Sequence, residues 1–348
     1  MTIYITGDIH ASYDIEKLSS SHFDATGLTK DDYVIICGDF GLVWNNSTSE
    51  QYWLRWLDAK PFTTLFVDGN HEGFHALNNL PTCTWHGGIA QKVNDSVYHL
   101  MRGELYDLDG ITLFAMGGAA SSAYDKETRT KGIGWFPEEI PTQAEREHAI
   151  ETLENANWNV DIVITHCAPT SCEESIAAVT NRLELHPMDE YTNWLETIRQ
   201  KATYSQWFCG HYHIDAQLTN NITALYNKIA KLEIPAEIGQ TQESAQDALN
   251  NATITYKIIE KKQVVIEPND PFEDLEEDPE WQDQLLWRYP SQNAEEGRMR
   301  GVAPKHIKIP RTGSPPSAEG ARAQHPPPSA ERARAHRRPG TQKGPRGR

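Results

Sequence analysis

The stretch TIYITGDIH at residues 2–10 joins a short apolar run to a carboxylate and an imidazole. The run predicts a strand, and residues i and i+2 at the end of an extended segment point to the same side. Asp8 and His10 can therefore reach one point, where an oxygen and an imidazole nitrogen suit a divalent transition metal. The same pattern also fits a turn followed by a helix cap, so the metal interpretation depends on whether the pattern recurs.

The pattern recurs after four further apolar runs, which span residues 33–37, 64–67, 161–165 and 205–209. Each run ends in residues that bind metals or transfer protons. The five runs together deliver eight candidate residues: Asp8, His10, Asp39, Asn70, His71, His166, His211 and His213. The other histidines are scattered along the chain, and we interpret them as surface or packing residues: His22, His75, His86, His99, His148, His186, His306, His325 and His336.

The order of the elements predicts the fold class. Strands alternate with helices expected at 12–21 and 47–60, which is typical of βαβ crossovers and a mainly parallel sheet whose ligands gather at the carboxyl ends of the strands. Short alternating segments and an Asp109-Gly110 turn then predict a second sheet. We expect an α/β fold of two mixed β-sheets packed face to face. The second sheet is expected to contain strands 97–100, 103–108, 111–116, 222–226, 254–260 and 263–267, the last two as a hairpin.

Two more helices and one long connection complete the expected elements. Thr142 and Glu145 form a capping box that opens a helix to residue 155, and another helix is expected at 188–201. The connection at 117–141 is rich in glycine and polar residues, and loops of this length are usually functional or disordered. Its glycines and aromatic residues favour an ordered lid.

The composition fits a globular chain of 348 residues, since 38% of them are hydrophobic. No apolar run is long enough to cross a membrane. The first strand begins at the N-terminus and leaves no room for a signal peptide, so we expect a cytoplasmic protein. The 5 cysteines are an odd number and suggest free thiols in the core rather than a disulfide framework.

Charge divides the chain into segments. Before Ser291 there are 19 Lys and Arg against 45 Asp and Glu, and from Ser291 onward there are 13 against 4. We expect a catalytic domain at 1–270, an acidic segment with a possible short helix at 271–290, and a disordered basic tail rich in Pro, Ala and Arg at 291–348. The acidic body opposes nonspecific nucleic-acid binding, so nucleic acid is expected to bind only through the tail, which is otherwise a non-adaptive extension.

The ordered set GD-x-H, GD, GNHE, a lone His after a strand and GH-x-H resembles the calcineurin-like metallophosphoesterase superfamily over about residues 1–230, and in particular its small bacterial and phage members. The resemblance implies a four-layer αββα sandwich with a dimetal site at the carboxyl ends of the strands. It also implies a metal-dependent phosphoric ester hydrolase, in which metal-bound hydroxide attacks a phosphomonoester or phosphodiester, with a small molecule or a nucleotide as the favoured substrate.

The resemblance also assigns roles to residues of this chain. Asp8, His10 and His213 would hold the first metal, whereas Asn70, His166 and His211 would hold the second. Asp39 would bridge the two, and His71 would act on the leaving oxygen. The ligand set favours Mn2+, with Fe or Zn as alternatives, because it mixes oxygen and nitrogen without a thiolate. Asp68 or Glu72 would orient imidazoles of the site or else serve as ordinary caps or solvated carboxylates.

The substrate is less constrained by the motifs. Protein phosphatases of this superfamily carry an Arg in the second block that binds phosphate, and the stretch GDFGLVW at residues 38–44 has none. Lys126 or Arg129 in the connection would take its place, unless they form a solvated charge pair. A nuclease or a protein phosphatase is the alternative function. A noncatalytic scaffold is a remote alternative, because such a protein would lose ligands and none is missing here.

Overall fold

The computed structural model describes residues 1–180, 186–235 and 254–259, all within the compact unit Met1–Glu295. The predicted segments 271–290 and 291–348 and the predicted strand 263–267 lie outside the described residues. The expected domain boundaries therefore stay predictions.

The first sheet has eight strands within the described residues, in the order β14-β13-β1-β2-β3-β6-β5-β4. Its four central strands are parallel, and pairs of antiparallel strands extend it on both sides. The bounds are β1 Ile3–Thr6, β2 Tyr33–Ile36, β3 Thr63–Phe66, β4 Thr82–Trp85, β5 Gly88–Asn94, β6 Val97–Leu100, β13 Ile229–Glu233 and β14 Thr255–Ile259.

The second sheet has six strands within the described residues, in the order β11-β12-β10-β9-β8-β7. Strands β8, β9, β10 and β12 are parallel, and β7 and β11 are antiparallel at the two edges. The bounds are β7 Glu104–Leu108, β8 Ile111–Met116, β9 Ile162–Thr165, β10 Gln206–Cys209, β11 Ala216–Gln217 and β12 Ile222–Ala224.

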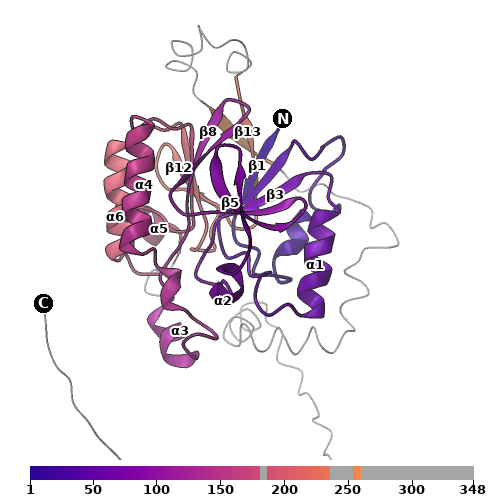
Figure 1. Ribbon diagram of the computed structural model, residues 1–348. Coiled ribbons are helices and arrows are strands. Elements are labelled where there is room, and N and C mark those ends of the chain that lie inside the picture. Colours follow the sequence, from indigo (N-terminus) through magenta and orange to yellow (C-terminus); the bar gives the residue numbers. More distant parts are fainter. Residues whose placement is uncertain (181–185, 236–253, 260–348) are drawn as a thin grey trace, which may run out of the picture. The chain divides into compact units, whose positions relative to one another are not determined.

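Helices cover the outer faces of the sheets. Figure 1 shows α1 beside the first sheet, and α4, α5 and α6 together beside the second. The α-helices are α1 Thr48–Asp58, α2 Phe74–Leu77, α3 Ala123–Thr128, α4 Gln143–Asn155, α5 Glu173–Val179 and α6 Glu190–Lys201. Short 3-10 helices occur at Ile15–Leu18, Pro137–Glu139 and Thr170–Cys172.

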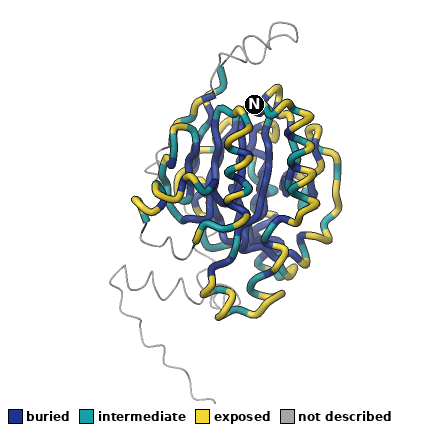
Figure 2. The backbone as a smooth tube through the Cα atoms, turned by 90° about the vertical axis from the view of Figure 1, so that its left-hand side faces the viewer, coloured by how far each residue is buried: buried dark blue, intermediate teal, exposed yellow. Residues whose placement is uncertain are grey.

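The apolar residues of the central strands explain this layering, because successive side chains of a strand face opposite sides. In β2, Ile35 belongs to the core between the two sheets, whereas Val34 and Ile36 belong to the core under α1. In β9, Ile164 faces the other sheet and Val163 faces the helical side. Strands buried on both faces read as unbroken apolar runs, and Figure 2 shows the interior strands as buried. The predicted α/β fold with two packed mixed sheets and flanking helices is confirmed.

Two local predictions are also confirmed, namely a hairpin and a capping box, and other local features follow. The Asp109-Gly110 turn joins β7 and β8 in an antiparallel hairpin. Thr142 and Glu145 form the capping box at the start of α4, with both hydrogen bonds present. The connection 117–141 is ordered and contains α3 and a 3-10 helix. All five cysteines have free thiols. Within the described part of the chain, no helix is long and apolar enough to span a membrane.

The helix predicted at 12–21 is wrong, because the structure has only a four-residue 3-10 helix at Ile15–Leu18. His10 and Ala11 adopt left-handed backbone conformations just before it. The hydroxyl of Ser19 contacts Ser21 and His22 just after it, and serine hydroxyls that bond locally compete with helical hydrogen bonding.

Two predicted strands belong to a different sheet from the one expected. β6 joins the first sheet beside β3, and β14 pairs with β13 in the same sheet. Local apolar patterns identify a strand, but pairing partners depend on contacts between distant parts of the chain.

Phe208→Ala should lower the free energy of unfolding of this unit by about 3–5 kcal/mol, because the ring is fully buried between the two sheets and its removal leaves a cavity. Urea unfolding followed by tryptophan fluorescence measures the change. Tyr124→Ala is the matched control, since Tyr124 is 52% exposed and should change stability by less than about 0.5 kcal/mol. Equal effects of the two substitutions would contradict the assigned core.

Candidate metal centre

The eight candidate residues lie just beyond the carboxyl ends of strands in both sheets. β1, β2 and β3 contribute from the first sheet, and β9 and β10 contribute from the second. Seven of the eight are buried, and the side chain of His213 is 21% exposed. The residues that follow each strand are Asp8 and His10 after β1, Asp39 after β2, Asn70 and His71 after β3, His166 after β9, and His211 and His213 after β10.

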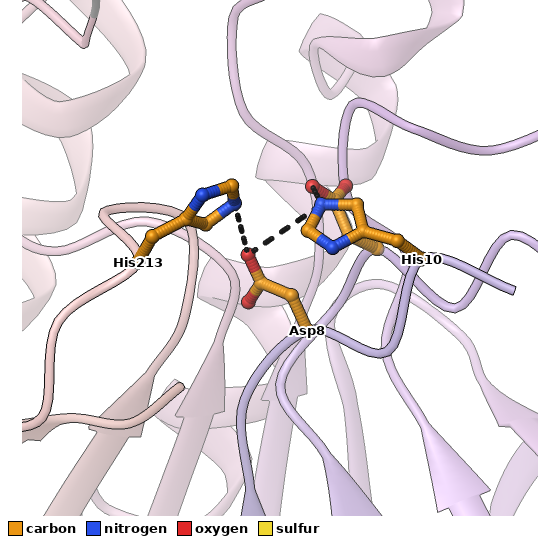
Figure 3. Close-up of side chains that lie close together, drawn as sticks. Asp8, His10 and His213 are labelled. Atoms are coloured by element: carbon orange, nitrogen blue, oxygen red, sulfur yellow. Dashed lines mark ion pairs between the residues drawn. The ribbon is translucent and has the colours of Figure 1, made fainter. Parts of the chain in front are cut away.

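Four of these residues form a compact group. Asp8, His10, Asp39 and His213 each offer one ligand atom, and these atoms all lie within 4.8 Å of one another. Asp8 Oδ2 lies 3.3 Å from His213 Nε2 and 4.0 Å from His10 Nε2. Figure 3 shows the two imidazoles on either side of the Asp8 carboxylate, with a nitrogen of each directed at it. The group has the donor atoms and the spacing of a metal site.

Asp39 also lies close to a second pair of imidazoles, those of His166 and His211. Its Oδ2 is 3.2 Å from His10 Nε2, and its Oδ1 is 3.2 Å from His166 Nε2. The ring of His166 in turn lies 4.9 Å from that of His211, measured between centroids. The backbone N–H of His71 donates to Asp39 Oδ1 at 2.7 Å and holds the carboxylate in place. One carboxylate oxygen of Asp39 therefore faces His10 and the other faces His166.

Hydrogen bonds behind the site fix the direction of its imidazoles. His166 donates its Nδ1–H to the backbone carbonyl of Cys37 at 2.6 Å, which directs its Nε2 at Asp39. His10 Nδ1 lies 2.6 Å from Asp14 Oδ2, which leaves its Nε2 directed at the site. Histidine ligands of metals usually have such a partner on the other ring nitrogen, because it sets the tautomer and the orientation.

The carboxylates give the site a strong preference for positive charge. Burial lowers the pKa of His10, but hydrogen bonds to Asp14 and Asp39 outweigh it and raise the pKa to about 10. Burial likewise lowers the pKa of His166, and Asp39 and Asp8 raise it to about 9. Burial raises the pKa of Asp8, whereas a hydrogen bond from His213 and the charge of His166 bring it down to about 2. A divalent cation would satisfy the same carboxylates.

Asn70 provides a separate test of whether a metal fits. Its Oδ1 is buried and has no hydrogen-bond partner within the described part of the chain. An amide oxygen buried in this way is costly unless a donor or a cation meets it. The remaining donors are carboxylate oxygens and imidazole nitrogens, which suit Mn2+, Fe or Zn2+. The residues present therefore fit a metal centre.

The backbone at the site is strained. Four of the candidate residues are not glycine and yet have positive φ: His10 at 42°, Asp39 at 49°, His211 at 69° and His213 at 52°. Such left-handed conformations cost free energy and tend to concentrate at functional sites. The surrounding hydrogen bonds hold them, as when the backbone N–H of His211 donates to both oxygens of Asp8 at 3.0 and 3.2 Å.

Two positions in the motifs require glycine, because a carboxylate from another motif lies very close to the backbone there. A Cβ added to Gly69 would overlap the carboxylate of Asp39, and a Cβ added to Gly210 would overlap that of Asp8. The glycine that precedes Asn70 and the one that precedes His211 thus make room for the carboxylate of another motif. This explains why the pattern pairs glycine with a ligand.

His71 and Arg129 lie together at one side of the site. Arg129 donates from a guanidinium nitrogen to His71 Nδ1 at 3.3 Å, and it also pairs with Asp125 at 3.0 Å. Burial lowers the pKa of His71 to about 3, with Arg129 and His10 adding to the effect and Asp39 opposing it. Lys126, the other candidate for substrate binding, instead pairs with the buried Glu139 at 3.2 Å.

The suggestion that Asp68 or Glu72 orients the imidazoles of the metal ligands is wrong. Asp68 pairs with Arg102 and lies 3.2 Å from His99, which is not a candidate ligand. Glu72 accepts hydrogen bonds from the backbone N–H groups of Phe40, Gly41 and Gly69, so it joins the loops after β2 and β3.

Sequence reasoning missed two residues near the candidate ligands. Asp14 orients His10 from four residues further along the chain. His186, which was assigned to the scattered histidines, has its Nδ1 3.2 Å from Nε2 of His211. Asp14 lies four residues after His10, but that spacing brings side chains together only in a regular helix, which this segment does not form. His186 follows no apolar run, so the sequence carried no signal for it.

A model of the calcineurin-like phosphoesterase family matches residues 1–215, which is more than half of the chain. The chain belongs to this family. The resemblance drawn from the motifs is thereby confirmed, and the family is one that implies divalent metal ions.

Two distant relatives carry the same name. A lariat debranching enzyme of Schizosaccharomyces pombe is 24% identical over 161 residues, which cover 44% of this chain and 33% of the relative. A lariat debranching enzyme of Drosophila pseudoobscura pseudoobscura is 23% identical over 241 residues, which cover 60% of this chain and 41% of the relative. The chain thus spans about a third to two fifths of the length of these relatives.

Asp39→Ala should reduce the metal content of both predicted sites, because one oxygen of Asp39 faces His10 and the other faces His166. Elemental analysis after reloading metal-stripped protein with Mn2+ and removing excess ion measures this. Asp95→Ala is the control, since that side chain is 91% exposed and should leave the metal content unchanged. Thermal unfolding of both variants checks that they fold, and normal metal content in folded Asp39→Ala would rule out the bridging role.

Proposed function

We propose that this chain hydrolyses a phosphodiester of nucleotide size with the help of two divalent metal ions. The observation that carries the proposal is the position of Asp39, with one oxygen 3.2 Å from His10 and the other 3.2 Å from His166. Asp8, His10 and His213 would hold one ion, Asn70, His166 and His211 would hold the other, and Asp39 would be shared. Mn2+ is the proposed ion.

When bound, two neighbouring divalent ions would polarise the phosphate and activate water for attack on phosphorus. A shared carboxylate suits this arrangement, because its negative charge reduces the repulsion between the two cations. Asn70 contributes a neutral oxygen, so the site retains enough positive charge to attract a phosphate. The loops after the strands are buried and held by backbone hydrogen bonds, which keeps the ligands in place before the substrate arrives.

His71 is proposed to act on the leaving oxygen. Arg129 can only donate hydrogen bonds, so His71 Nδ1 must accept at this contact, and the neutral ring then carries its proton on Nε2. Nε2–H is the group that His71 would present to the leaving oxygen as its negative charge develops. Stabilisation of this kind by a positioned donor is a recognised source of rate enhancement.

Arg129 is proposed to bind the phosphate of the substrate. Its guanidinium lies beside His71, and its side chain is only 11% exposed, so its charge is partly shielded from solvent. It would supply the positive charge that the stretch GDFGLVW at residues 38–44 lacks. Lys126 pairs with Glu139 and Arg129 with Asp125, and Arg129 is the stronger candidate because it also contacts His71.

The preference for a diester rests on the names of the two relatives, since both are lariat debranching enzymes and that activity is a phosphodiesterase activity. The acidic composition before Ser291 disfavours long polyanions and supports a substrate of nucleotide size. Metal-stripped protein reloaded with Mn2+ should therefore cleave bis-p-nitrophenyl phosphate faster than p-nitrophenyl phosphate. Faster cleavage of the monoester would support a phosphatase or nucleotidase instead of a phosphodiesterase. If the protein binds two metals and cleaves neither ester, the result would support a noncatalytic scaffold.

His71→Ala should lower kcat by about 10²- to 10⁴-fold and leave the Mn2+ content unchanged, because His71 is proposed to act on the substrate and not on the metals. Steady-state kinetics on the preferred chromogenic ester, together with elemental analysis, gives both quantities. His148→Ala, with a side chain that is 47% exposed, is the control. A His71→Ala variant that loses metal would show that this residue supports the site instead.

Arg129→Met should reduce kcat/KM by about 10- to 100-fold, which is the expected loss of one hydrogen bond to a charged group. Lys126→Met is a matched control within the same segment and should have a much smaller effect, because its partner is Glu139. If Lys126→Met has the larger effect, the phosphate contact belongs to Lys126.

A further inference from the structure

Tyr226 lies outside every motif, two residues beyond the end of β12, and yet its ring packs on one of the proposed metal ligands. The rings of Tyr226 and His213 are stacked, with centroids 4.6 Å apart and planes 11° from parallel. A stacked neighbour of this kind restricts rotation of the imidazole about its side-chain bonds. The side chain of His213 is 21% exposed, and the ring of Tyr226 covers one of its faces.

The hydroxyl of Tyr226 reaches a second ligand through Asp14. It donates to Asp14 Oδ1 at 3.2 Å, and Asp14 Oδ2 lies 2.6 Å from His10 Nδ1. The two oxygens of Asp14 are thus used by two different partners. This arrangement fixes the plane of the carboxylate and, through it, the direction in which His10 presents Nε2.

The backbone of Tyr226 is linked to a third ligand. Lys17 is almost fully buried, and its ammonium donates to the carbonyl oxygen of Tyr226 and, at 2.6 Å, to that of Asp8. The loop after β12 and the end of β1 therefore share one buried cation. The backbone N–H of Tyr226 is held in turn by Asp215 at 2.8 Å.

We propose that Tyr226 is a positioning residue for the first of the two proposed metals. Its side chain contacts His213 by stacking and His10 through Asp14, and its backbone carbonyl shares the ammonium of Lys17 with the backbone carbonyl of Asp8. The three ligands that this metal would not share are thus each linked to Tyr226, directly or through one or two intermediate residues. The inference rests on the proposed function, because it takes Asp8, His10 and His213 as ligands of one ion. Partners that orient metal ligands typically contribute about 10- to 100-fold in metal affinity.

Calorimetric titration of Mn2+ into the metal-stripped full chain tests the proposal directly, without any substrate. Tyr226→Leu, which removes both ring and hydroxyl, should weaken one of the two Mn2+ sites by about 10-fold and leave the other unchanged. Tyr226→Phe keeps the stacked ring and should weaken the same site by a smaller factor. Tyr33→Phe is the matched control, because it removes a hydroxyl 3.3 Å from His86 Nε2, away from the proposed ligands, and should bind Mn2+ as the wild type does.

A double-mutant cycle separates positioning from general destabilisation. If the hydroxyl acts through Asp14, Tyr226→Phe should have no further effect on Mn2+ affinity in an Asp14→Asn background. A purely structural role would give additive effects, together with lower thermal stability of the metal-free protein.

The outcomes distinguish this inference from the function on which it rests. Wild-type protein that binds two Mn2+ ions, with Tyr226→Leu and Tyr226→Phe unchanged, would overturn the positioning role and leave the proposed function intact. Equal weakening of both sites would overturn it as well. Wild-type protein that binds neither Mn2+, Zn2+ nor Fe2+ would overturn the proposed function, and the inference with it.

Discussion

The contact on which the site depends is that of the Asp39 carboxylate with one imidazole from each sheet. His10 follows β1 in the first sheet and His166 follows β9 in the second, and each lies 3.2 Å from a different oxygen of Asp39. The distance between these imidazoles is set by how the two sheets pack. Because protein interiors are close-packed, the apolar core between the sheets acts as a rigid spacer for the site.

Hydrogen bonds that hold the candidate ligands also come from neighbouring loops. The carbonyl of Cys37, at the end of β2, holds His166, and Glu72, after β3, holds backbone N–H groups of its own loop and of the loop after β2. Each motif therefore positions residues of another motif as well as its own. The two relatives are distant and are matched over less than half of their length. The proposed substrate therefore depends mainly on the residues around the candidate metal site.

The candidate ligands and the fold class could be predicted from the sequence because each ligand directly follows a strand, and a buried strand leaves a clear apolar run. The supporting residues could not be predicted in this way. Asp14 follows no strand, and Tyr226 meets it across 212 positions of the chain, a contact that only the folded sheets create. The sheet membership of β6 and β14 was missed for the same reason, since edge and pairing choices are decided by distant partners. The helix predicted at 12–21 failed because the strained turn at His10 and Ala11 sets the path of the chain there.

At His10, Asp39, His211 and His213, the left-handed backbone sets the stability of the fold against the binding of metal. Glycine would adopt these conformations without strain, yet a glycine has no side chain with which to bind an ion. The residue type that the backbone prefers and the one that the chemistry needs are therefore different at four neighbouring positions. An evolving or engineered version of this protein cannot gain stability there without losing a candidate ligand, so gains in stability must come from the sheets and helices that surround the site.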